Sequence, residues 1–233
     1  RAQRALGVSR VVMSAVADSG AALTALASVA QRSGPAASAW RDEVRAAIAW
    51  RPAAWSTIVA DSPGVLHPVE MCRALQPVLD SHPEAVLVAD GGEIGQWAQA
   101  CLSAPNRVIN GVAGSIGAAL PFALAAKIVY PQAPVIAVLG DGTFGFHPAE
   151  FDTAVREQAP FVAVVGNDQC WNAEYQIQLR EYGVERAVGC ELLPTRYDQV
   201  AAGFGGYGEQ VIRGADMSAA LARAVASGKP ACI

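Results

Sequence analysis

The chain has 233 residues, of which 52% are hydrophobic and only 16% are charged, so it can bury a sizeable core and is not a disordered chain. The net charge of −4 excludes the basic surface that nucleic-acid binding requires, and no apolar run reaches the roughly 18 residues of a membrane span. Five scattered cysteines without CxxC spacing predict reduced thiols in a cytoplasmic protein, and the three histidines show no zinc-site spacing.

The first 60 residues are predicted to form the end of one domain and a linker to the next. Residues 11–17 are a short apolar run that indicates a strand, and residues 21–31 and 37–50 have the composition of two helices. Pro52 and Pro63 favour an irregular linker, so the boundary is placed at residue 60 and residues 61–233 are expected to form the second domain. The chain starts without Met and stops within an apolar run, so we expect it to be part of a longer protein.

Residues 61–233 alternate between predicted helices and short strands, which is typical of an α/β fold. The helices are expected at 68–79, 96–101, 115–128, 148–157, 197–202 and 217–226, and the strands at 85–89, 135–139, 161–165 and 210–212. The strands are continuous apolar runs, which indicates a parallel sheet covered by helices on both faces. We therefore predict a doubly wound parallel sheet, a fold that binds ligands beyond the carboxyl ends of its strands.

Three predicted strands end in segments that combine glycine with aspartate: Asp90-Gly91-Gly92, Gly140-Asp141-Gly142 and Gly166-Asn167-Asp168. Taken alone, Gly140-Asp141-Gly142 could be an ordinary surface turn, since Asp-Gly is a common turn pair. Asp141 and Asp168, however, are 27 positions apart (168 − 141 = 27), which accommodates one right-handed crossover to a neighbouring parallel strand. The two carboxylates would repel each other unless a cation lies between them, and Mg²⁺ with a diphosphate fits that position.

The spacing of Gly140-Asp141-Gly142 and Gly166-Asn167-Asp168 resembles the cofactor motif of thiamine-diphosphate (ThDP) enzymes. Much of residues 65–233 is similar to the diphosphate-binding domain of the acetolactate synthase-like group, which includes 2-hydroxyacyl-CoA lyases and 2-oxoacid or oxalyl-CoA decarboxylases. Residues 144–146 and 150–153 most resemble the acetolactate synthase-like and acyl-CoA lyase-like branches. By this resemblance, residues 61–233 form a ThDP-binding fold, and residues 1–60 are the C-terminal remnant of a middle domain plus the linker.

The resemblance implies a metal site and a cofactor site. The metal ligands would be the carboxylates of Asp141 and Asp168 and the main-chain oxygen of Cys170. Most relatives have Asn in place of Asp168, and the added charge is expected to tighten metal binding and to repel the diphosphate. The residues expected to contact the cofactor are Gly92, Glu93, Ile94, Ile116, Gly140, Gly142, Thr143, Trp171 and Asn172.

Some of these residues also have simpler interpretations. Ile116 would prop the cofactor in a bent conformation, but it could equally be a core residue at a helix entry. Glu93 is unsuited to contact a phosphate through its side chain, so only its backbone is a credible contact. Trp171, with Asn172 and Tyr175, could shape a substrate pocket or merely pack. The G-x-G-x-x-G pattern at 203–208 follows a helix, so it is interpreted as a helix-to-strand connection and not as a dinucleotide site.

The resemblance implies an enzyme that makes or cleaves a C–C bond next to a carbonyl, with ThDP and Mg²⁺ as cofactors. An acetolactate synthase-like carboligase (a transferase) acting on a 2-oxoacid is the first choice. A 2-hydroxyacyl-CoA lyase or a 2-oxoacid or oxalyl-CoA-type decarboxylase is the alternative. A non-catalytic ThDP-fold subunit and a Mg²⁺-dependent nucleotide-binding domain are alternatives of other classes, although the sequence has no Walker-type Gly-Lys-Ser/Thr. The resemblance also allows FAD, which has no signature in this sequence.

No catalytic residue is assigned in this chain. The activating Glu of the family belongs to a pyrimidine-binding domain, and no such domain is found in this sequence. Glu70, Glu93 and Glu150 all fall in diphosphate-domain positions, so none of them is given that role. The Glu is expected from a missing segment or from another chain, in a homodimer or homotetramer that acts on a small 2-oxoacid or 2-hydroxyacyl substrate and binds neither nucleic acid nor a membrane.

Overall fold

The computed structural model describes residues 16–32, 38–110 and 114–233. The chain divides into two compact units, Arg1–Trp50 and Arg51–Ile233. The described helices of the first unit are α1 (Ser19–Arg32) and α2 (Ser38–Ala49), where helices were predicted. Helix α1 begins where it does because the Asp18 carboxylate accepts a hydrogen bond from the backbone N–H of Ala21 and so caps the helix. Most of the strand predicted at 11–17 lies outside the described residues.

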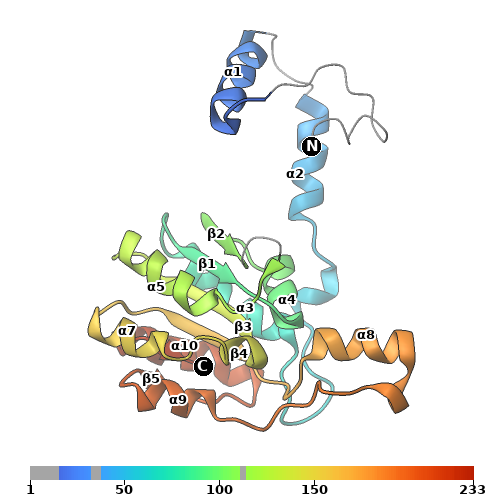
Figure 1. Ribbon diagram of the computed structural model, residues 1–233, viewed down its shortest axis with the longest axis vertical. Coiled ribbons are helices and arrows are strands. Elements are labelled where there is room, and N and C mark those ends of the chain that lie inside the picture. The colour runs from blue at the N-terminus through green and yellow to red at the C-terminus, as the bar shows by residue number, and fades with distance from the viewer. Residues whose placement is uncertain (1–15, 33–37, 111–113) are drawn as a thin grey trace. The chain divides into compact units, whose positions relative to one another are not determined.

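The second unit contains a six-stranded sheet with the order β2-β1-β3-β4-β6-β5, and every pairing in it is parallel (Figure 1). The strands are β1 (Val86–Ala89), β2 (Asn106–Ile109), β3 (Val135–Gly140), β4 (Val162–Gly166), β5 (Tyr207–Gly208) and β6 (Ala231–Cys232). After β1, the chain forms β2 on one side of β1 and then returns to form β3 on the opposite side of β1. This reversal opens a crevice at the carboxyl ends of β1 and β3, where such sheets bind ligands.

Helices cover both faces of the sheet, which confirms the predicted doubly wound parallel α/β fold (Figure 1). One core lies between the sheet and helices α3 (Pro68–Asp80), α4 (Glu93–Cys101) and α10 (Gly214–Ala226). The other core involves α5 (Ala119–Val129), α7 (Glu150–Arg156) and α9 (Tyr197–Gly203), together with the short helix α6 (Asp141–Phe144). Neighbouring strand residues such as Leu87 and Val88 enter opposite cores, so both faces of the central strands are apolar.

The structure differs from the prediction in several strands and helices. Strand β2 was not predicted because it is a short edge strand that contains Asn and Arg and has no buried residue. Helix α8 (Asn172–Tyr182) was not predicted because it lies on the surface without a buried face. Helices α4 and α10 each begin three residues earlier than predicted, and α5 begins four residues later. The strand predicted at 210–212 was wrong: the last ladder bond is from Glu209 N–H to the Cys232 carbonyl, and the paired residues are Tyr207–Gly208.

The segment predicted as a linker lies against the second unit. Residues 53–56 form a short 3-10 helix, η2 (Ala53–Ser56), and the guanidinium of Arg73 on α3 donates hydrogen bonds of 2.8 Å to the carbonyl oxygens of Trp55 and Ile58. The compact second unit therefore begins at Arg51, ten residues before the expected start at 61. Among the described residues, no helix combines the length and the apolar character that crossing a bilayer needs.

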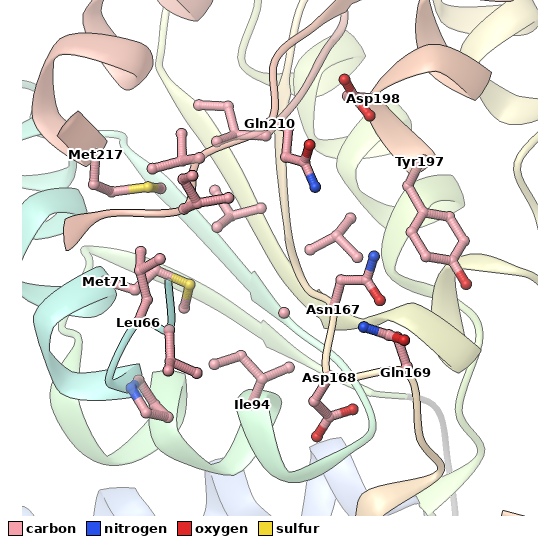
Figure 2. Close-up of a pocket in the computed structure, with 18 of the residues that line it drawn as sticks. Leu66, Met71, Ile94, Asn167, Asp168, Gln169, Tyr197, Asp198, Gln210 and Met217 are labelled. Atoms are coloured by element: carbon pink, nitrogen blue, oxygen red, sulfur yellow. The ribbon is translucent and has the colours of Figure 1, made fainter. Parts of the chain in front are cut away.

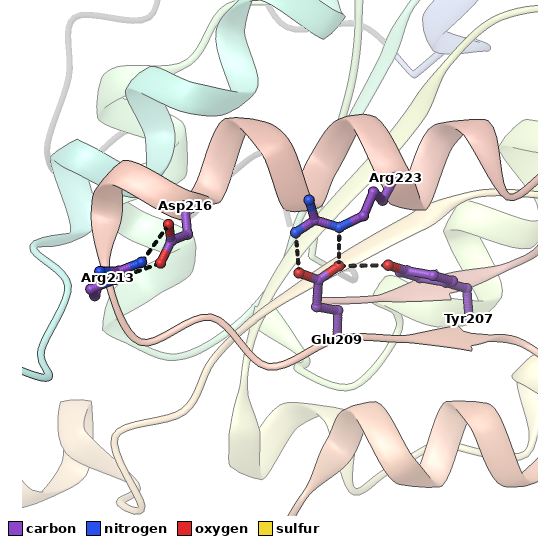
Figure 3. A network of polar contacts seen from close by, with 5 residues as sticks. All are labelled: Tyr207, Glu209, Arg213, Asp216 and Arg223. Atoms are coloured by element: carbon purple, nitrogen blue, oxygen red, sulfur yellow. Dashed lines mark hydrogen bonds and ion pairs between the residues drawn. The ribbon is translucent and has the colours of Figure 1, made fainter.

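An ion pair fastens α10 to the end of β5 (Figure 3). Arg223 binds both carboxylate oxygens of Glu209, and the hydroxyl of Tyr207 donates a 2.5 Å hydrogen bond to the same carboxylate. The hydrogen bond from Arg223 lowers the pKa of Glu209 below its ordinary value of 4.5. Since the folded-state pKa is the lower one, the stability from this pair is complete above pH 4.5 and is lost as the pH falls through the lowered pKa.

Arg223→Met is therefore expected to lower the melting temperature at pH 7 more than at pH 3, because the contribution of the ion pair falls as the pH falls toward the lowered pKa of Glu209. Thermal unfolding followed by circular dichroism between pH 3 and 7 measures this difference. Arg213→Met is the matched control, since Arg213 pairs with Asp216 on the same helix but its side chain is 71% exposed, and its effect should be smaller. An equal loss at pH 3 and pH 7 would contradict the assignment.

Candidate functional site

Asp141 and Asp168 lie at the same edge of the sheet. Asp141 directly follows β3, and Asp168 lies two residues after β4. These strands are neighbours, and Gly140 at the end of β3 pairs in register with Gly166 at the end of β4. A cavity of about 100 Å³ opens between the two strand ends, and both carboxylates line it. The single crossover that the spacing predicted is therefore present, and it places the two acidic residues at one cavity.

The same cavity gathers every residue that the resemblance implied for the metal and the cofactor. They come from the start of α4, the segment before α5, the β3–α6 junction and the segment after β4, which are far apart in the sequence. The cavity is lined by residues 92–94, 116, 140–143, 166, 168 and 170–174. Only Gly166, Ala173 and Glu174 in this set were not anticipated, and each is a neighbour of an anticipated residue in the sequence or across the sheet.

Asp141 has a buried carboxylate oxygen that has no partner among the described residues. The residue is 2% exposed, and its Oδ1 accepts a 2.8 Å hydrogen bond from the backbone N–H of Gly142. Its Oδ2 is buried and accepts no hydrogen bond from the described residues. Burial raises the pKa of Asp141, and the backbone N–H groups of Gly142, Gln169 and Cys170 offset only part of this effect. Buried polar atoms in native proteins nearly always have a partner, so this oxygen is suited to a ligand such as a cation.

Asp168 adds a second negative group beside Asp141. Its side chain is open to the cavity, and its Oδ1 accepts a 3.2 Å hydrogen bond from the backbone N–H of Cys170. Burial, then the charge of Asp141, raises the pKa of Asp168 to about 6. Gln169, which lies between Asp168 and Cys170 in the chain, has a φ of 61°. This left-handed conformation is uncommon for a residue other than glycine and often marks a functional segment. The bend brings Cys170 back to pair with Glu191 and places it in the cavity wall.

The two carboxylates do not by themselves complete the coordination of a cation, so main-chain, phosphate or water oxygens would have to supply the other ligands. Among the described residues, no three His, Cys, Asp or Glu side chains are arranged around one point as a complete metal site. Mg²⁺ commonly takes only one or two protein carboxylates and completes its shell with phosphate and water oxygens. The geometry therefore fits a magnesium ion that is bound together with a diphosphate, and it does not fit a zinc site.

Glycines let side chains and backbone approach closely around the cavity. A Cβ atom added to Gly142 would lie 2.6 Å from the ring of Trp171, and one added to Gly91 would lie 2.2 Å from Ile116. Gly92 has a φ of 79°, a conformation that residues with side chains rarely adopt. These positions keep the cavity floor made of backbone, which is the surface that binds phosphate groups in many α/β folds.

Asp90, the third strand-end aspartate, has a structural role. It is 2% exposed, and its carboxylate accepts hydrogen bonds from the backbone N–H groups of Gly91 (2.6 Å), Gly117 (3.1 Å) and Ala119 (2.6 Å). These bonds hold the segment that enters α5 and place Ile116 beside Gly91. Ile116 is 37% exposed and lines the cavity, so it is not an ordinary core residue.

Asp90→Ala is expected to lower the free energy of unfolding by about 2 kcal/mol, because it leaves three buried backbone donors without their charged acceptor. Urea unfolding measures the change. Asp90→Asn should recover part of the loss, since the amide oxygen can still accept one or two of these bonds. A loss below about 0.5 kcal/mol for Asp90→Ala, the range typical of simple surface changes, would contradict the role.

The side chain of Glu93 is occupied by partners within the protein. Its Oε2 accepts a 2.8 Å hydrogen bond from the amide of Asn172, and its Oε1 accepts a 3.3 Å bond from the indole N–H of Trp97. The contact between Glu93 and Asn172 joins the start of α4 to the start of α8 across the cavity wall. That only the backbone of Glu93 would contact a phosphate stays a prediction. Trp171 packs edge-on against Phe146 at 6.1 Å between ring centroids.

A larger cavity of about 440 Å³ lies beside the first one (Figure 2). The two cavities share Glu93, Ile94, Gly166, Asp168 and Asn172 in their walls. Figure 2 shows Asp168 and Ile94 at one end of the larger cavity and Met217, from α10, at a distance from them. The sequence did not predict this cavity, because its walls come from α3, β4, β6 and α10, which carry no common motif.

The fold and this strand-end cavity are those of α/β proteins that bind phosphorylated ligands beyond the carboxyl ends of their strands. Residues 90–233 match the family described as "Thiamine pyrophosphate enzyme, C-terminal TPP binding domain", and the chain belongs to this family. Thiamine pyrophosphate is another name for ThDP. The resemblance inferred from Gly140-Asp141-Gly142 and Asp168 is thereby confirmed.

The chain is similar in sequence to two relatives with different names. It is 38% identical over 172 residues to the "Probable acetolactate synthase" of Mycobacterium bovis, which covers 72% of this chain and 31% of that protein. It is 37% identical over 152 residues to "2-hydroxyacyl-CoA lyase 2" of Caenorhabditis elegans, which covers 64% of this chain and 23% of that protein. The chain thus spans less than a third of the length of either relative.

A solved structure has the same fold. The Rhodococcus jostii RHA1 thiamine diphosphate-dependent 4-hydroxybenzoylformate decarboxylase superimposes with a TM-score of 0.67 over 76% of this chain and 33% of its own chain. The sequence identity is 18%, so this likeness concerns the fold alone.

Proposed function

We propose that this chain is the diphosphate-binding part of a ThDP-dependent enzyme that makes or cleaves a C–C bond next to a carbonyl. The observation that carries the proposal is the Oδ2 of Asp141, which is buried and meets no partner in the described part of the chain, in a cavity that Asp141 shares with Asp168. These carboxylates and the main-chain oxygen of Cys170 would hold Mg²⁺. The positive charge of the bound ion would counteract both the burial and the charge of Asp141 that raise the pKa of Asp168.

The other lining residues would hold the cofactor itself. The backbone of Gly92, Gly140, Gly142 and Thr143 would lie against the diphosphate, because these residues present small side chains or none to the cavity. Ile116, Ile94 and Trp171 would contact its organic part. ThDP, when bound, supplies a thiazolium ring that accepts the electron pair of the breaking C–C bond. The protein's task at this edge is to bind and orient the cofactor.

We propose acetolactate synthase-like carboligation of a 2-oxoacid as the reaction. The 38% identity to the Mycobacterium bovis protein supports it. Cleavage of a 2-hydroxyacyl-CoA is the second candidate, because the Caenorhabditis elegans lyase is almost equally similar. The activating Glu and the pyrimidine-binding domain would come from another part of the protein or another subunit of a homodimer or homotetramer. The described cysteines are all free thiols, which suits a cytoplasmic enzyme.

The test is a product assay on the full-length protein with ThDP and Mg²⁺. Pyruvate as sole substrate should yield acetolactate, whereas a lyase should instead convert a 2-hydroxyacyl-CoA to a shortened aldehyde. Parallel reactions with and without FAD decide whether that cofactor is required. ThDP binding without turnover of either substrate would favour a non-catalytic subunit. Failure of the full-length protein to bind ThDP would overturn the proposal.

A further inference from the structure

Helices α3 and α4 lie side by side and are fastened at both ends of their contact. Near the start of α3, the rings of His67 and Trp97 meet edge-on with centroids 5.7 Å apart. Near its end, the Gln76 amide donates a 2.9 Å hydrogen bond to the Ser103 carbonyl and accepts one of 2.9 Å from the Ser103 N–H. The contact between these two points is therefore held in a fixed register.

Two thiols face each other between those fastenings. Cys72 on α3 is fully buried, and Cys101, the last residue of α4, is partly buried against the same core. The two thiols lie close enough to interact with each other, and both are free. The interaction with Cys72, opposed by burial and assisted by the positive charge of Arg51, lowers the pKa of Cys101. The same interaction and burial raise the pKa of Cys72.

We propose that Cys72 and Cys101 are a dithiol oxidation site, in which a hydroperoxide converts the pair to a disulfide that joins α3 to α4. The geometry assigns different roles to the two cysteines. Cys101 is the more accessible of the two thiols, so a peroxide from the solvent reaches its sulfur first. Cys72 is buried beside it and would be the resolving thiol, which attacks the sulfenic acid formed on Cys101.

The reaction balances with hydrogen peroxide as the oxidant. The Cys101 sulfur attacks one peroxide oxygen, the O–O bond breaks, and a sulfenic acid and one water form. The Cys72 sulfur then attacks the sulfenic sulfur, the S–O bond breaks, and a second water leaves as the S–S bond forms. Two thiols lose two electrons and two protons, and the peroxide is reduced to two waters. The two sulfur atoms must approach to about 2.05 Å.

The disulfide would hold α4, the helix that borders the proposed cofactor cavity, against α3. Helix α4 runs from Glu93, in the wall of that cavity, to Cys101 at its other end. Joining residues 72 and 101 closes a loop in the unfolded chain, so the oxidised protein should melt about 5 °C or more above the reduced protein. The oxidation site stands independently of the reaction that the enzyme catalyses.

The experiment is a peptide map of the full-length protein after treatment with hydrogen peroxide. Free thiols are blocked with iodoacetamide in denaturant, and the digest is analysed without reduction. The expected result is a cross-linked pair of peptides that contain Cys72 and Cys101, 2 Da lighter than the sum of the reduced peptides. Cys232, which is fully buried, is the internal control and should remain alkylated.

Two variants separate the roles. In Cys72→Ser, peroxide should leave Cys101 as a sulfenic acid that dimedone traps, whereas Cys101→Ser should leave Cys72 unmodified. If either variant fails to fold, the peptide map of the unsubstituted protein still tests whether Cys72 and Cys101 form a disulfide. The proposal would be overturned if Cys72 and Cys101 were both recovered as alkylated thiols after the other accessible thiols had been oxidised. It would also be overturned if cross-links were scattered among the five cysteines.

Discussion

Replacing Asp141 with Ala is expected to weaken Mg²⁺-dependent binding of ThDP by more than about 100-fold, because it removes one of only two carboxylates at the proposed metal site. Calorimetric titration of the full-length protein with ThDP, with and without Mg²⁺, measures the loss. The unsubstituted protein should bind tightly only when Mg²⁺ is present. Binding that is unchanged in Asp141→Ala would contradict the assignment of the metal site.

Asp141→Asn separates metal binding from folding. The amide oxygen can keep the hydrogen bond from Gly142, while the negative charge that burial and Asp168 oppose is removed. The metal-free variant should therefore be as stable as the unsubstituted protein or up to about 1 kcal/mol more stable, although it binds Mg²⁺ and ThDP poorly. A purely structural Asp141 would show the opposite result, with stability lost in the metal-free protein and little change in affinity.

Gly95→Ala is expected to lower the free energy of unfolding by about 3 kcal/mol or more. A Cβ atom at Gly95 would lie 1.5 Å from the carbonyl oxygen of Asp90, and neither group can rotate away because both belong to the backbone. Strand β1 and helix α4 would have to separate where they form the floor of the cavity. The melting temperature should fall by about 6 to 12 °C, which differential scanning calorimetry measures.

Gly203→Ala is the matched control for this substitution. Gly203 is the last residue of α9, and a Cβ atom added to it would meet no atom within 4 Å outside its own helix backbone and chain neighbours. Alanine there should change stability by less than about 0.5 kcal/mol or raise it slightly, because it restricts the unfolded chain. Similar losses for the two variants would show that the close contact at Gly95 does not limit the packing of α4.

The sequence by itself determined the fold class and the pairing of Asp141 with Asp168. Both depend on local patterns: β3 and β4 are continuous apolar runs, and the single crossover between them places their ends side by side. The family motif then indicated the other residues of the small cavity, because they lie next to a glycine at a strand end or a helix entry or, for Cys170, Trp171 and Asn172, directly follow Asp168 and Gln169 in the chain. Elements without such a pattern, the edge strand β2 and the surface helix α8, were not predicted.

Only the tertiary structure decided which groups have partners. Asp90 and Asp141 both follow an apolar strand, yet the carboxylate of Asp90 is occupied by backbone donors and that of Asp141 keeps a buried oxygen free of any described partner. The bond between Glu93 and Asn172, 79 positions apart, and the meeting of Cys72 with Cys101 also had no signal in the sequence. Hydrogen bonding and burial depend on which distant segments pack together, and no local pattern encodes that arrangement.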